Sequence, residues 1–393
     1  MTRLALGIDL GTSGVRSAVI DPEGSVVAMA KSSYGPDESS RRDPDCWWSA
    51  VIDCLTSQVQ SLEDINVDLS QIVGMAVDGT SGSLVLTDAA ITPVTRALMY
   101  DDGKLEAEAD RIAAIAPKKH VARGPSSALA RALRLVKEDS KNRAVHLLHQ
   151  ADFITARLLG RGGSTDFNNA LKTGLDPETG LWPDWLKGLD ELSELLPKAV
   201  APGTQLGTID EAIAKILGLP VNTKVHAGTT DSIAAFLSAV GPAPGAAVTS
   251  LGTTLTVKLF SKKRIDDPSL GLYSHRLGKS WLIGGASNTG GGVLKSLFSI
   301  DQLETLSAEI DPTIESPYEY YPLLARGERF PINDPWMSPR LTPRPINDVE
   351  FLHGLFESIA RIERRAYEIM IDRGAPRPSK IITVGGGAAN QTW

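Results

Sequence analysis

The sequence predicts an α/β protein of two lobes that repeat one plan around a central cleft. A glycine-rich hairpin at residues 8–16 occurs again in the second half of the chain, at residues 249–257. The chain has 393 residues, of which 42% are hydrophobic, and this length exceeds what one ordinary core organises. Strand patterns also alternate with helical ones. We therefore expect two domains, with one hairpin from each at a shared ligand site.

Composition excludes several classes of protein. The formal net charge is −7 and the basic residues are scattered, which argues against a nucleic-acid partner. The two cysteines, Cys46 and Cys54, are too few for a disulfide framework or a zinc site, and no apolar run reaches the roughly 20 residues of a membrane span. We expect a cytoplasmic protein with a small-molecule partner and no membrane partner. The plastid stroma is the alternative if a transit peptide precedes the chain.

The first half begins as an open α/β sheet. Apolar runs flank the first hairpin from Leu4 onward, and further strands are expected at residues 72–77 and 224–227. A helix is expected at residues 231–239. Residues 164–183, rich in Asp, Asn, Gly and Thr, indicate surface loops over a cleft. The other expected helices of this half are residues 47–62, 105–114, 128–137, 147–159 and 209–217.

The first hairpin has the residues of a phosphate-binding turn. Gly11 and Gly14 allow a positive φ and a close backbone approach, so successive N–H groups can point at an anion. Thr12 and Ser13 add hydroxyl donors. Asp9 stands at the entrance, where a carboxylate can hold Mg²⁺ through water beside the phosphates. The alternative is an ordinary hairpin turn, which the same residue types favour.

The second hairpin repeats the Leu-Gly-Thr turn at Gly252 and Thr253, which we expect to contact phosphate. Ser250 stands where Asp9 stands in the first copy. Metal binding is therefore expected in the N-terminal lobe alone. Proline and glycine residues at 241–245 break the chain directly before this hairpin, so the predicted domains are residues 1–240 and 241–393.

Asp231 is the strongest candidate for a catalytic group. It stands between Gly228-Thr229-Thr230 and an apolar helix, where a strand end meets a helix start. At this place the helix dipole keeps a carboxylate ionised, and a substrate hydroxyl can donate to it while attacking a γ-phosphate in line. The alternative is a helix N-cap, a position that aspartate favours and stabilises by about 1 kcal/mol.

A polar segment follows the strand at residues 72–77. Asp78 and Ser81 lie at its carboxyl end, where open α/β sheets place ligands, and Thr80 and Ser81 can bind sugar hydroxyls. Tyr100-Asp101-Asp102 and residues 166–172 offer further polar groups for a polyol pocket. A solvated loop is the alternative for each. His146 and His149 have the spacing of a helix pair and no metal-ligand spacing.

Two glycine clusters in the second half can contact a nucleotide. Gly385-Gly386-Gly387 with Asn390 indicates a flat backbone surface for adenine and ribose, or simply a turn from strand to helix. The run at residues 284–292, which includes Gly291, opens a helix and is either a close helix entry or a nucleotide contact. A long amphipathic helix is expected at residues 349–373, after a proline-studded stretch at 331–345.

Four motifs in this order make the chain similar to the FGGY carbohydrate kinases, which have the actin-like and Hsp70-like ATPase fold, a ribonuclease H-like duplication. The motifs are Asp9-x-Gly11-Thr12-x-x-x-Arg16, Gly228-Thr229-Thr230-Asp231, Ser250-x-Gly252-Thr253 and Gly385-Gly386-Gly387-x-x-Asn390. More narrowly, the chain resembles the D-ribulose kinases of plants and cyanobacteria, often labelled xylulose-kinase-like. That resemblance rests on residues 77–82, 150–152, 168–172, 227–236 and 326–331.

The resemblance implies transfer of the γ-phosphate of ATP to the terminal hydroxyl of a ketopentose, most simply D-ribulose. It implies that Asp231 is the base and a substrate contact, with Asp9, Asp78 and Ser81 also at the substrate. Asp9 would hold Mg²⁺ in the N-terminal lobe, and the C-terminal lobe would hold the nucleotide. The implied ATP contacts are Gly11, Thr12, Ser13, Arg16, Gly252, Thr253, Gly291, Gly385, Gly386, Gly387 and Asn390.

Two departures from the family leave alternatives open. Bacterial xylulokinases have Gln-x-His-Gly where this chain has Thr80-Ser81-Gly82, which argues against D-xylulose, although D-xylulose or another ketose or polyol is the alternative substrate. Family members continue beyond the glycine triplet, so we expect the C-terminal lobe to be truncated here. A catalytically weak sugar- or nucleotide-binding protein is therefore an alternative, and an ATPase that drives a conformational change is another.

Overall fold

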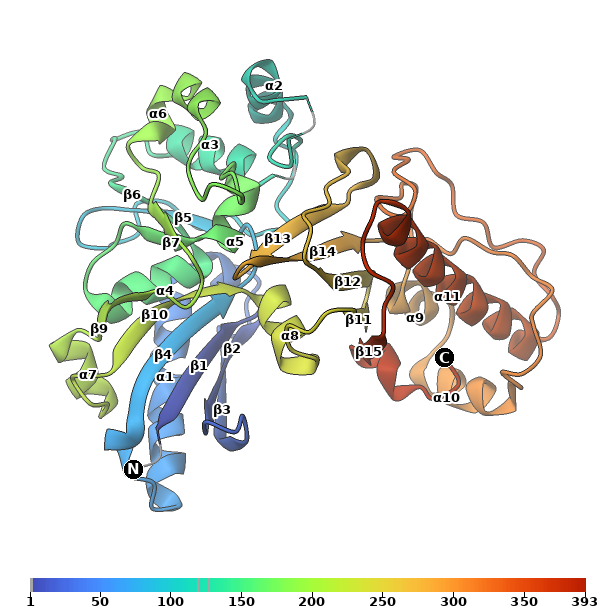
Figure 1. The fold of residues 1–393 in the computed structure, drawn as a ribbon, viewed down its shortest axis with the longest axis horizontal. Coiled ribbons are helices and arrows are strands. Elements are labelled where there is room, and N and C mark those ends of the chain that lie inside the picture. The colour runs from blue at the N-terminus through green and yellow to red at the C-terminus, as the bar shows by residue number, and fades with distance from the viewer. Residues whose placement is uncertain (1–2, 119, 126) are drawn as a thin grey trace. The chain divides into compact units, whose positions relative to one another are not determined.

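The computed structural model describes residues 3–118, 120–125 and 127–393, which form two compact units (Figure 1). Unit 1 comprises Met1–Ala235 and unit 2 comprises Phe236–Trp393. The division falls inside helix α8 (Asp231–Ala239). The domain boundary after residue 240 stays a prediction. Among the described residues, no helix is both long and apolar enough to span a membrane.

Unit 1 is built on a six-stranded sheet in the order β3-β2-β1-β4-β10-β9. β1 pairs with β2 in antiparallel fashion and with β4 in parallel, and β4 pairs with β10 in parallel. The carboxyl ends of β1, β4 and β10 therefore meet at one edge of the sheet. The strands are β1 (Leu4–Leu10), β2 (Gly14–Ile20), β3 (Val26–Ser33), β4 (Ile72–Gly79), β9 (Gln205–Thr208) and β10 (Lys224–Thr230).

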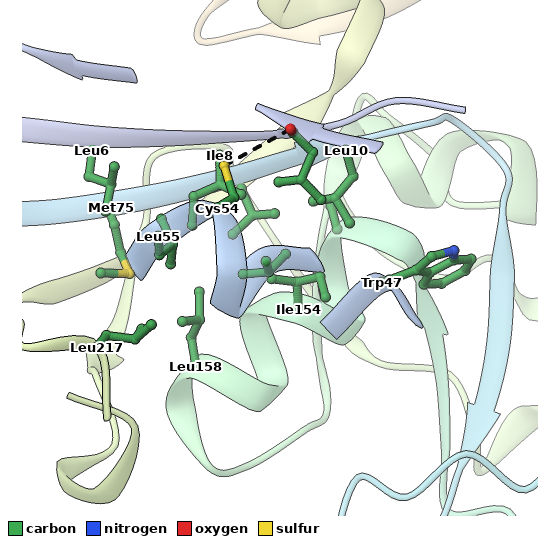
Figure 2. Close-up of a cluster of buried hydrophobic side chains, with 14 of the residues drawn as sticks. Leu6, Ile8, Leu10, Trp47, Cys54, Leu55, Met75, Ile154, Leu158 and Leu217 are labelled. Atoms are coloured by element: carbon green, nitrogen blue, oxygen red, sulfur yellow. Dashed lines mark hydrogen bonds between the residues drawn. The ribbon is translucent and has the colours of Figure 1, made fainter. Parts of the chain in front are cut away.

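Three helices pack on one face of this sheet: α1 (Pro44–Asp64), α4 (Gln150–Leu159) and α7 (Glu211–Leu217). Alternate residues of β1 point into this core, and all of them are fully buried. Figure 2 shows Leu6, Ile8 and Leu10 of β1 facing side chains of α1 and α4. Because the period of a strand is two, the remaining β1 positions, including Asp9, face the other side.

A second core in unit 1 lies under α2 (Glu106–Ile115), α3 (Ala128–Glu138) and α6 (Asp190–Ser193). It includes the two-stranded sheet of β5 (Leu84–Thr87) and β6 (His146–His149). The prediction of one helix over residues 147–159 is wrong at its start, because the helix begins at Gln150. His149 is therefore the last residue of a strand and is fully buried, and does not form a surface helix pair with His146.

The prediction that residues 164–183 are surface loops is wrong for residues 164–173, whereas turns with exposed residues follow them. Residues 164–173 include β7 (Ser164–Asp166), which pairs in parallel with β8 (Lys198–Val200), and helix α5 (Phe167–Ala170). Asp166, Asn168 and Asn169 are almost completely buried. Composition indicated a loop because these residue types favour turns, but polar side chains that bond to one another can lie inside a protein.

Unit 2 is built on a five-stranded sheet in the order β13-β14-β12-β11-β15. The strands are β11 (Ala246–Leu251), β12 (Leu255–Ser261), β13 (Tyr273–Leu277), β14 (Ser280–Ala286) and β15 (Lys380–Val384). The helices are α9 (Gly291–Leu297), α10 (Ile300–Glu309) and α11 (Asp348–Asp372). A 3₁₀ turn, Gly386–Ala389, follows β15 where an α-helix was expected to start. The other 3₁₀ turns are Ser40–Arg42, Leu69–Gln71, Leu171–Thr173, Asp184–Gly188 and Pro268–Leu270.

Candidate active site

The hairpin of unit 1 turns between β1 and β2. The Gly11 N–H donates to Gly14 O at 2.9 Å, which closes the turn. Neither glycine has a positive φ, so that part of the prediction is wrong. The close approach seen at Gly14 is to a neighbouring strand, because an added Cβ would lie 2.3 Å from Ser32 O, whereas the predicted approach to a phosphate stays a prediction. Glycine is therefore required at this position because of β3, and not because of the turn itself.

Three carboxylates gather at the edge of the sheet where β1, β4 and β10 end. Asp9 of β1 lies opposite Asp78 of β4 in the parallel register, and Thr229 of β10 lies opposite Asp78 on the other side. A register shift precedes Thr229, and at Gly228 an added Cβ would lie 1.8 Å from Val77 O. This close approach brings the end of β10, and with it Asp231, beside β4.

Burial and the repulsion between neighbouring negative charges change the pKa of Asp78 in this carboxylate cluster. Burial, together with the negative charges of Asp9 and Asp231, raises the pKa of Asp78 to about 9. The Oδ1 atom of Asp78 is buried and has no hydrogen-bond partner among the described residues. These surroundings favour the neutral form of Asp78 over the charged form. A proton donor or a cation from a ligand would relieve the same repulsion.

Asp231 is the first residue of α8 and is half-buried. Its Oδ1 accepts a hydrogen bond from the N–H of Ser232 at 2.5 Å. The start of a helix is a favourable place for a negatively charged side chain. A charged carboxylate that keeps exposed surface can accept a proton from a ligand hydroxyl.

The turn after β4, Thr80–Ser83, is held by Gln150 at the start of α4. Gln150 Oε1 accepts from the N–H of Thr80 at 3.0 Å and from its hydroxyl at 2.7 Å, and the Gln150 N–H donates to Ser83 O at 3.0 Å. Between these clamped residues, Ser81 Oγ is buried with no partner among the residues that the structure describes. An unpartnered buried hydroxyl is costly, so Ser81 is well suited to bind a ligand hydroxyl.

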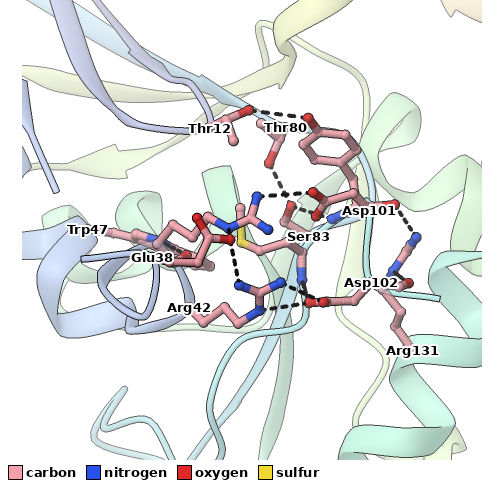
Figure 3. Close-up of polar contacts among 12 residues, drawn as sticks. Thr12, Glu38, Arg42, Trp47, Thr80, Ser83, Asp101, Asp102 and Arg131 are labelled. Carbon is pink, nitrogen blue, oxygen red and sulfur yellow. Dashed lines mark hydrogen bonds and ion pairs between the residues drawn. The ribbon is translucent and has the colours of Figure 1, made fainter. Parts of the chain in front are cut away.

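The segment Tyr100–Asp102 is fixed beside this turn by arginines (Figure 3). Arg42 bonds to both oxygens of Asp102, at 2.8 and 3.3 Å, and Arg41 pairs with Asp101 at 3.0 Å. Burial acts to raise the pKa of Asp102, but the bonds from Arg42 and from the Met99 N–H outweigh it and lower the pKa. Both carboxylates thus brace the segment, and we do not expect them to contact a polyol.

Arg131 connects the turn Thr80–Ser83 to the segment Tyr100–Asp102. Its guanidinium is almost completely buried and donates to Gly82 O at 3.1 Å, to Asp102 O at 3.0 Å and to Tyr100 O. These carbonyls belong to the turn Thr80–Ser83 and to the segment Tyr100–Asp102. Arg131 therefore fixes their relative positions, a role that nothing in its helical sequence context indicated.

A buried polar layer lies behind the end of β10. Asn168 donates to the Thr229 hydroxyl at 3.0 Å, and Asn169 donates to Thr229 O at 3.2 Å and to Asp166 at 2.5 Å. Burial, with a smaller contribution from the charge of Asp152, raises the pKa of Asp166 to about 7. Residues 166–172 were expected to offer polar groups to a polyol pocket or to form a solvated loop. In the structure they fix the strand end that precedes Asp231.

The hairpin of unit 2 borders a cavity of about 830 Å³. The turn is bound to the start of α9, because the N–H of Gly291 donates to Gly252 O at 2.8 Å and that of Gly292 donates to Thr253 O at 3.0 Å. Six of the predicted nucleotide contacts line this cavity: Gly252, Thr253, Gly291, Gly386, Gly387 and Asn390. Gly385, at φ +88°, makes the turn just before them, where an added Cβ would lie 2.9 Å from Leu251 O.

Asn390 shapes the wall of this cavity. Its Nδ2 donates to Ser307 Oγ at 2.7 Å, and its Oδ1 accepts from the Trp393 N–H at 2.9 Å. The Trp393 ring stacks on Phe356 at 5.3 Å between centroids. The Asn390 amide therefore joins α10 to the residues after β15. A nucleotide contact by this amide would have to share or replace these bonds.

Comparison with known proteins identifies the class. Residues 4–238 match the model of the N-terminal domain of the FGGY family of carbohydrate kinases, which is more than half of the chain. The chain belongs to the FGGY family of carbohydrate kinases. It is a sugar kinase, and sugar kinases of this family use ATP as the phosphate donor.

Several relatives are xylulose kinases. The chain is 26% identical to the xylulose kinase of Streptomyces coelicolor, over 99% of this chain and 81% of that protein, and 24% identical to that of Escherichia coli, over 99% and 83%. The crystal structure of xylulose kinase from Rhodospirillum rubrum matches with a TM-score of 0.85 at 21% identity, over 100% of this chain and 83% of that one. These structures confirm the two-lobed actin-like fold.

The carboxylate cluster is compatible with a magnesium ion. Mg²⁺ takes oxygen ligands and keeps several waters, so one or two carboxylates with substrate phosphates suffice. The structure supplies Asp9 next to Asp78, whose buried Oδ1 lacks a partner among the described residues. No group of three or more Asp, Glu, His or Cys side chains suited to a metal occurs in the described part of the chain. Any ion here would therefore rest largely on water and phosphate.

Proposed function

We propose that the protein phosphorylates the terminal hydroxyl of D-ribulose and forms D-ribulose 5-phosphate. One observation carries the proposal: the carboxylates of Asp9, Asp78 and Asp231 gather at a sheet edge next to Ser81, whose buried hydroxyl lacks a partner among the described residues. The site thus offers a base, an acidic group and a hydroxyl to a polyhydroxylated substrate.

Asp231 is the base in this mechanism. The terminal hydroxyl of the sugar gives its proton to Asp231 while its oxygen forms a bond to the γ-phosphorus of ATP. The bond between that phosphorus and the β,γ-bridging oxygen breaks, and ADP leaves with the electron pair. Ser81 and Asp78 hold other sugar hydroxyls, so that the terminal one stays aligned with Asp231.

The phosphates are held by backbone N–H groups and by hydroxyls. In unit 1 these would come from Thr12 and Ser13, with Arg16 nearby on β2, and in unit 2 from Gly252 and Thr253. Gly11, whose N–H already donates to Gly14 O, would contribute only a close backbone approach. Asp9 would hold Mg²⁺, which when bound neutralises phosphate charge during transfer. The cavity beside Gly386 and Gly387 has a volume of about 830 Å³, which suits the adenosine part of ATP.

The identity of the sugar rests on the turn after β4. Thr80-Ser81-Gly82 differs from the Gln-x-His-Gly pattern of bacterial xylulokinases and resembles D-ribulose kinases. D-xylulose is the second candidate, because curated relatives of this chain are xylulose kinases. The two sugars differ in the configuration of one carbon. Discrimination would therefore come from a single hydroxyl near Ser81.

The test is ADP release from this 393-residue chain with Mg-ATP and D-ribulose, D-xylulose or no sugar. We expect release with D-ribulose, and phosphorus NMR should show a phosphate ester on the terminal carbon. Asp231→Asn should lower the rate by about 10²–10⁴-fold. Asp348→Asn is the matched control, because Asp348 is also the first residue of a helix but only pairs with Arg344 at the surface. Faster release with D-xylulose would overturn the proposed substrate.

A further inference from the structure

An unbroken chain of hydrogen bonds joins the turn Thr80–Ser83 to the phosphate hairpin of unit 1. Thr80 donates its hydroxyl to Gln150 Oε1 at 2.7 Å, and Gln150 Nε2 donates to the Tyr34 hydroxyl at 3.4 Å. Tyr34 in turn donates to Gly11 O at 3.1 Å. We call Thr80, Gln150 and Tyr34 the relay. It connects two segments that the sequence separates by about 70 residues.

All the bonds of the relay point in one direction. Because the Thr80 hydroxyl donates to Gln150, the 2.6 Å bond between Thr80 and Ser83 must have Ser83 as donor. Ser83 Oγ accepts from the N–H of Tyr100 at 3.1 Å. Donors thus run in order from Tyr100 through Ser83 and the relay to Gly11. Bonds aligned in this way polarise one another, so a change at one end is felt at the other.

The relay is shielded from water. Gln150 and Thr80 are almost completely buried, and Tyr34 is 6% exposed. Burial, with the charge of Asp9, raises the pKa of Tyr34, which therefore remains a donor over the physiological range. Tyr34 is tied to the hairpin a second time, because its backbone N–H donates to Ser13 O at 3.2 Å. A displacement of Tyr34 must therefore displace the hairpin.

A second, exposed connection runs from Tyr100 to the same hairpin. The hydroxyls of Tyr100 and Thr12 lie 3.4 Å apart, and the Tyr100 N–H begins the buried route described above. Figure 3 shows Thr12, Thr80 and Ser83 around this connection. Ser81, with its unpartnered hydroxyl, lies between the two clamped residues of the turn. A ligand hydroxyl that binds Ser81 therefore acts on one end of the relay, and the phosphates act on the other.

We propose that Gln150 and Tyr34 are positioning residues that couple occupation of the sugar site to the shape of the phosphate hairpin. This inference rests on the proposed function, because it requires the sugar at Ser81 and the phosphates at Gly11 and Thr12. With the relay intact, the hairpin takes its phosphate-holding shape when sugar is bound. Without sugar, ATP binds more weakly and is hydrolysed slowly. Neither residue contacts the reacting atoms.

The experiment measures how much sugar tightens binding of a non-hydrolysable ATP analogue. Calorimetric titrations would be made with and without D-ribulose, and in parallel with D-xylulose. For the wild type we expect sugar to lower the dissociation constant of the analogue by about fivefold or more. For Tyr34→Phe we expect sugar to change this dissociation constant by less than about twofold. ADP release without sugar should rise in the same variant relative to release with sugar.

Two matched variants separate coupling from simple damage. Tyr320→Phe also removes a buried tyrosine hydroxyl that donates to a backbone carbonyl, Pro343 O at 2.8 Å, but lies in unit 2 outside the relay. It should keep the wild-type coupling. Thr80→Val breaks the relay at its other end, whereas Thr80→Ser retains the hydroxyl and should restore the coupling. If Tyr34→Phe does not fold, the pair at Thr80 decides the question.

The outcomes are distinct from those of the proposed function. Coupling with D-xylulose and not with D-ribulose would overturn the proposed substrate, and the variants would then be compared with D-xylulose. A wild type that transfers phosphate but shows no coupling with either sugar would overturn the relay alone. The relay would also be overturned if Tyr34→Phe and Thr80→Val fold and sugar still tightens binding of the ATP analogue as much as it does in the wild type.

Discussion

The two hairpins share a Leu-Gly-Thr turn but have different surroundings. In unit 1 the residue two before the glycine is Asp9, which lies beside Asp78 at the sheet edge. In unit 2 it is Ser250, and the turn is bound to the start of α9 and borders the cavity of about 830 Å³. The first hairpin thus lies beside carboxylates, and the second borders a cavity. This difference is the basis of our proposal that unit 1 supplies the reacting groups and unit 2 holds the nucleotide.

The largest expected effect comes from removing this difference in charge. Asp9→Ser gives the hairpin of unit 1 the residue that stands at the matching position of unit 2. We expect kcat to fall by about 10²-fold or more, because the variant lacks the carboxylate that is proposed to hold Mg²⁺ beside the phosphates. Ser250→Ala, at the matching position of unit 2, should change kcat far less. Steady-state kinetics with saturating Mg-ATP measure both. Equal losses in the two variants would contradict the division of roles.

A smaller effect is expected from adding a methyl group at a glycine that lines the cavity of unit 2. At Gly387 an added Cβ would lie 2.4 Å from the Trp393 ring and 2.8 Å from Leu251 Cβ, so Gly387→Ala must displace one of them. Such overpacking costs about 1–3 kcal/mol, and we expect the KM for ATP to rise about tenfold with little change in the KM for sugar. Gly386→Ala is the comparison, since its Cβ would meet nothing within 4 Å, and its effect should be smaller.

The buried layer behind β10 predicts a pH dependence of stability. The pKa of Asp166 is raised to about 7 in the folded protein from an ordinary value of 3.8. The folded protein therefore binds this proton more tightly than the unfolded chain does. The stabilisation is complete below about pH 4 and is lost as the pH rises to about 7, by ~4 kcal/mol as an order of magnitude. Thermal melting should show this decline between pH 5 and 7.

Asp166→Asn provides the control for this pH dependence. The variant cannot titrate at this position, so the decline of Tm between pH 5 and 7 should become shallower than in the wild type. Asp184→Asn changes an exposed aspartate in the same way and should leave the slope unchanged. A slope in Asp166→Asn equal to that of the wild type would show that another group is responsible.

The smallest effect concerns Arg16. Its side chain is 73% exposed and lies 3.9 Å from Asp9, so the ion pair contributes little to folding. We expect Arg16→Ala to change the free energy of unfolding by less than about 0.5 kcal/mol. The predicted phosphate contact would appear instead as a higher KM for ATP. An unchanged KM would remove Arg16 from the nucleotide site.

The sequence predicted the parts of the fold that depend on local pattern. Alternation in β1, the Leu-Gly-Thr turns and the helix that begins at Asp231 are local signals, and all are present in the structure. The errors occurred where a local signal competed with tertiary contacts. His149 belongs to a strand because β5 pairs with it, which no helical periodicity could reveal.

The supporting residues of the site could not be predicted for a related reason. Gln150 finds its partner Thr80 at a separation of 70 residues and Tyr34 at 116. Arg131 donates to backbone carbonyls, which leave no mark in the sequence. Asp166 and Asn169 resemble turn residues until the fold buries them. Site residues at strand ends can be inferred from the pattern, whereas the side chains that hold them require coordinates.

The most direct test of the central claim is a single-turnover measurement on Asp231→Asn. The dissociation constant of an ATP analogue would be determined in the same preparation by calorimetry. If unit 1 supplies the base and unit 2 holds the nucleotide, the variant should bind the analogue within about twofold of the wild type while phosphoryl transfer falls by at least about 10²-fold. Transfer at near wild-type rate, or a parallel loss of nucleotide binding, would contradict this account.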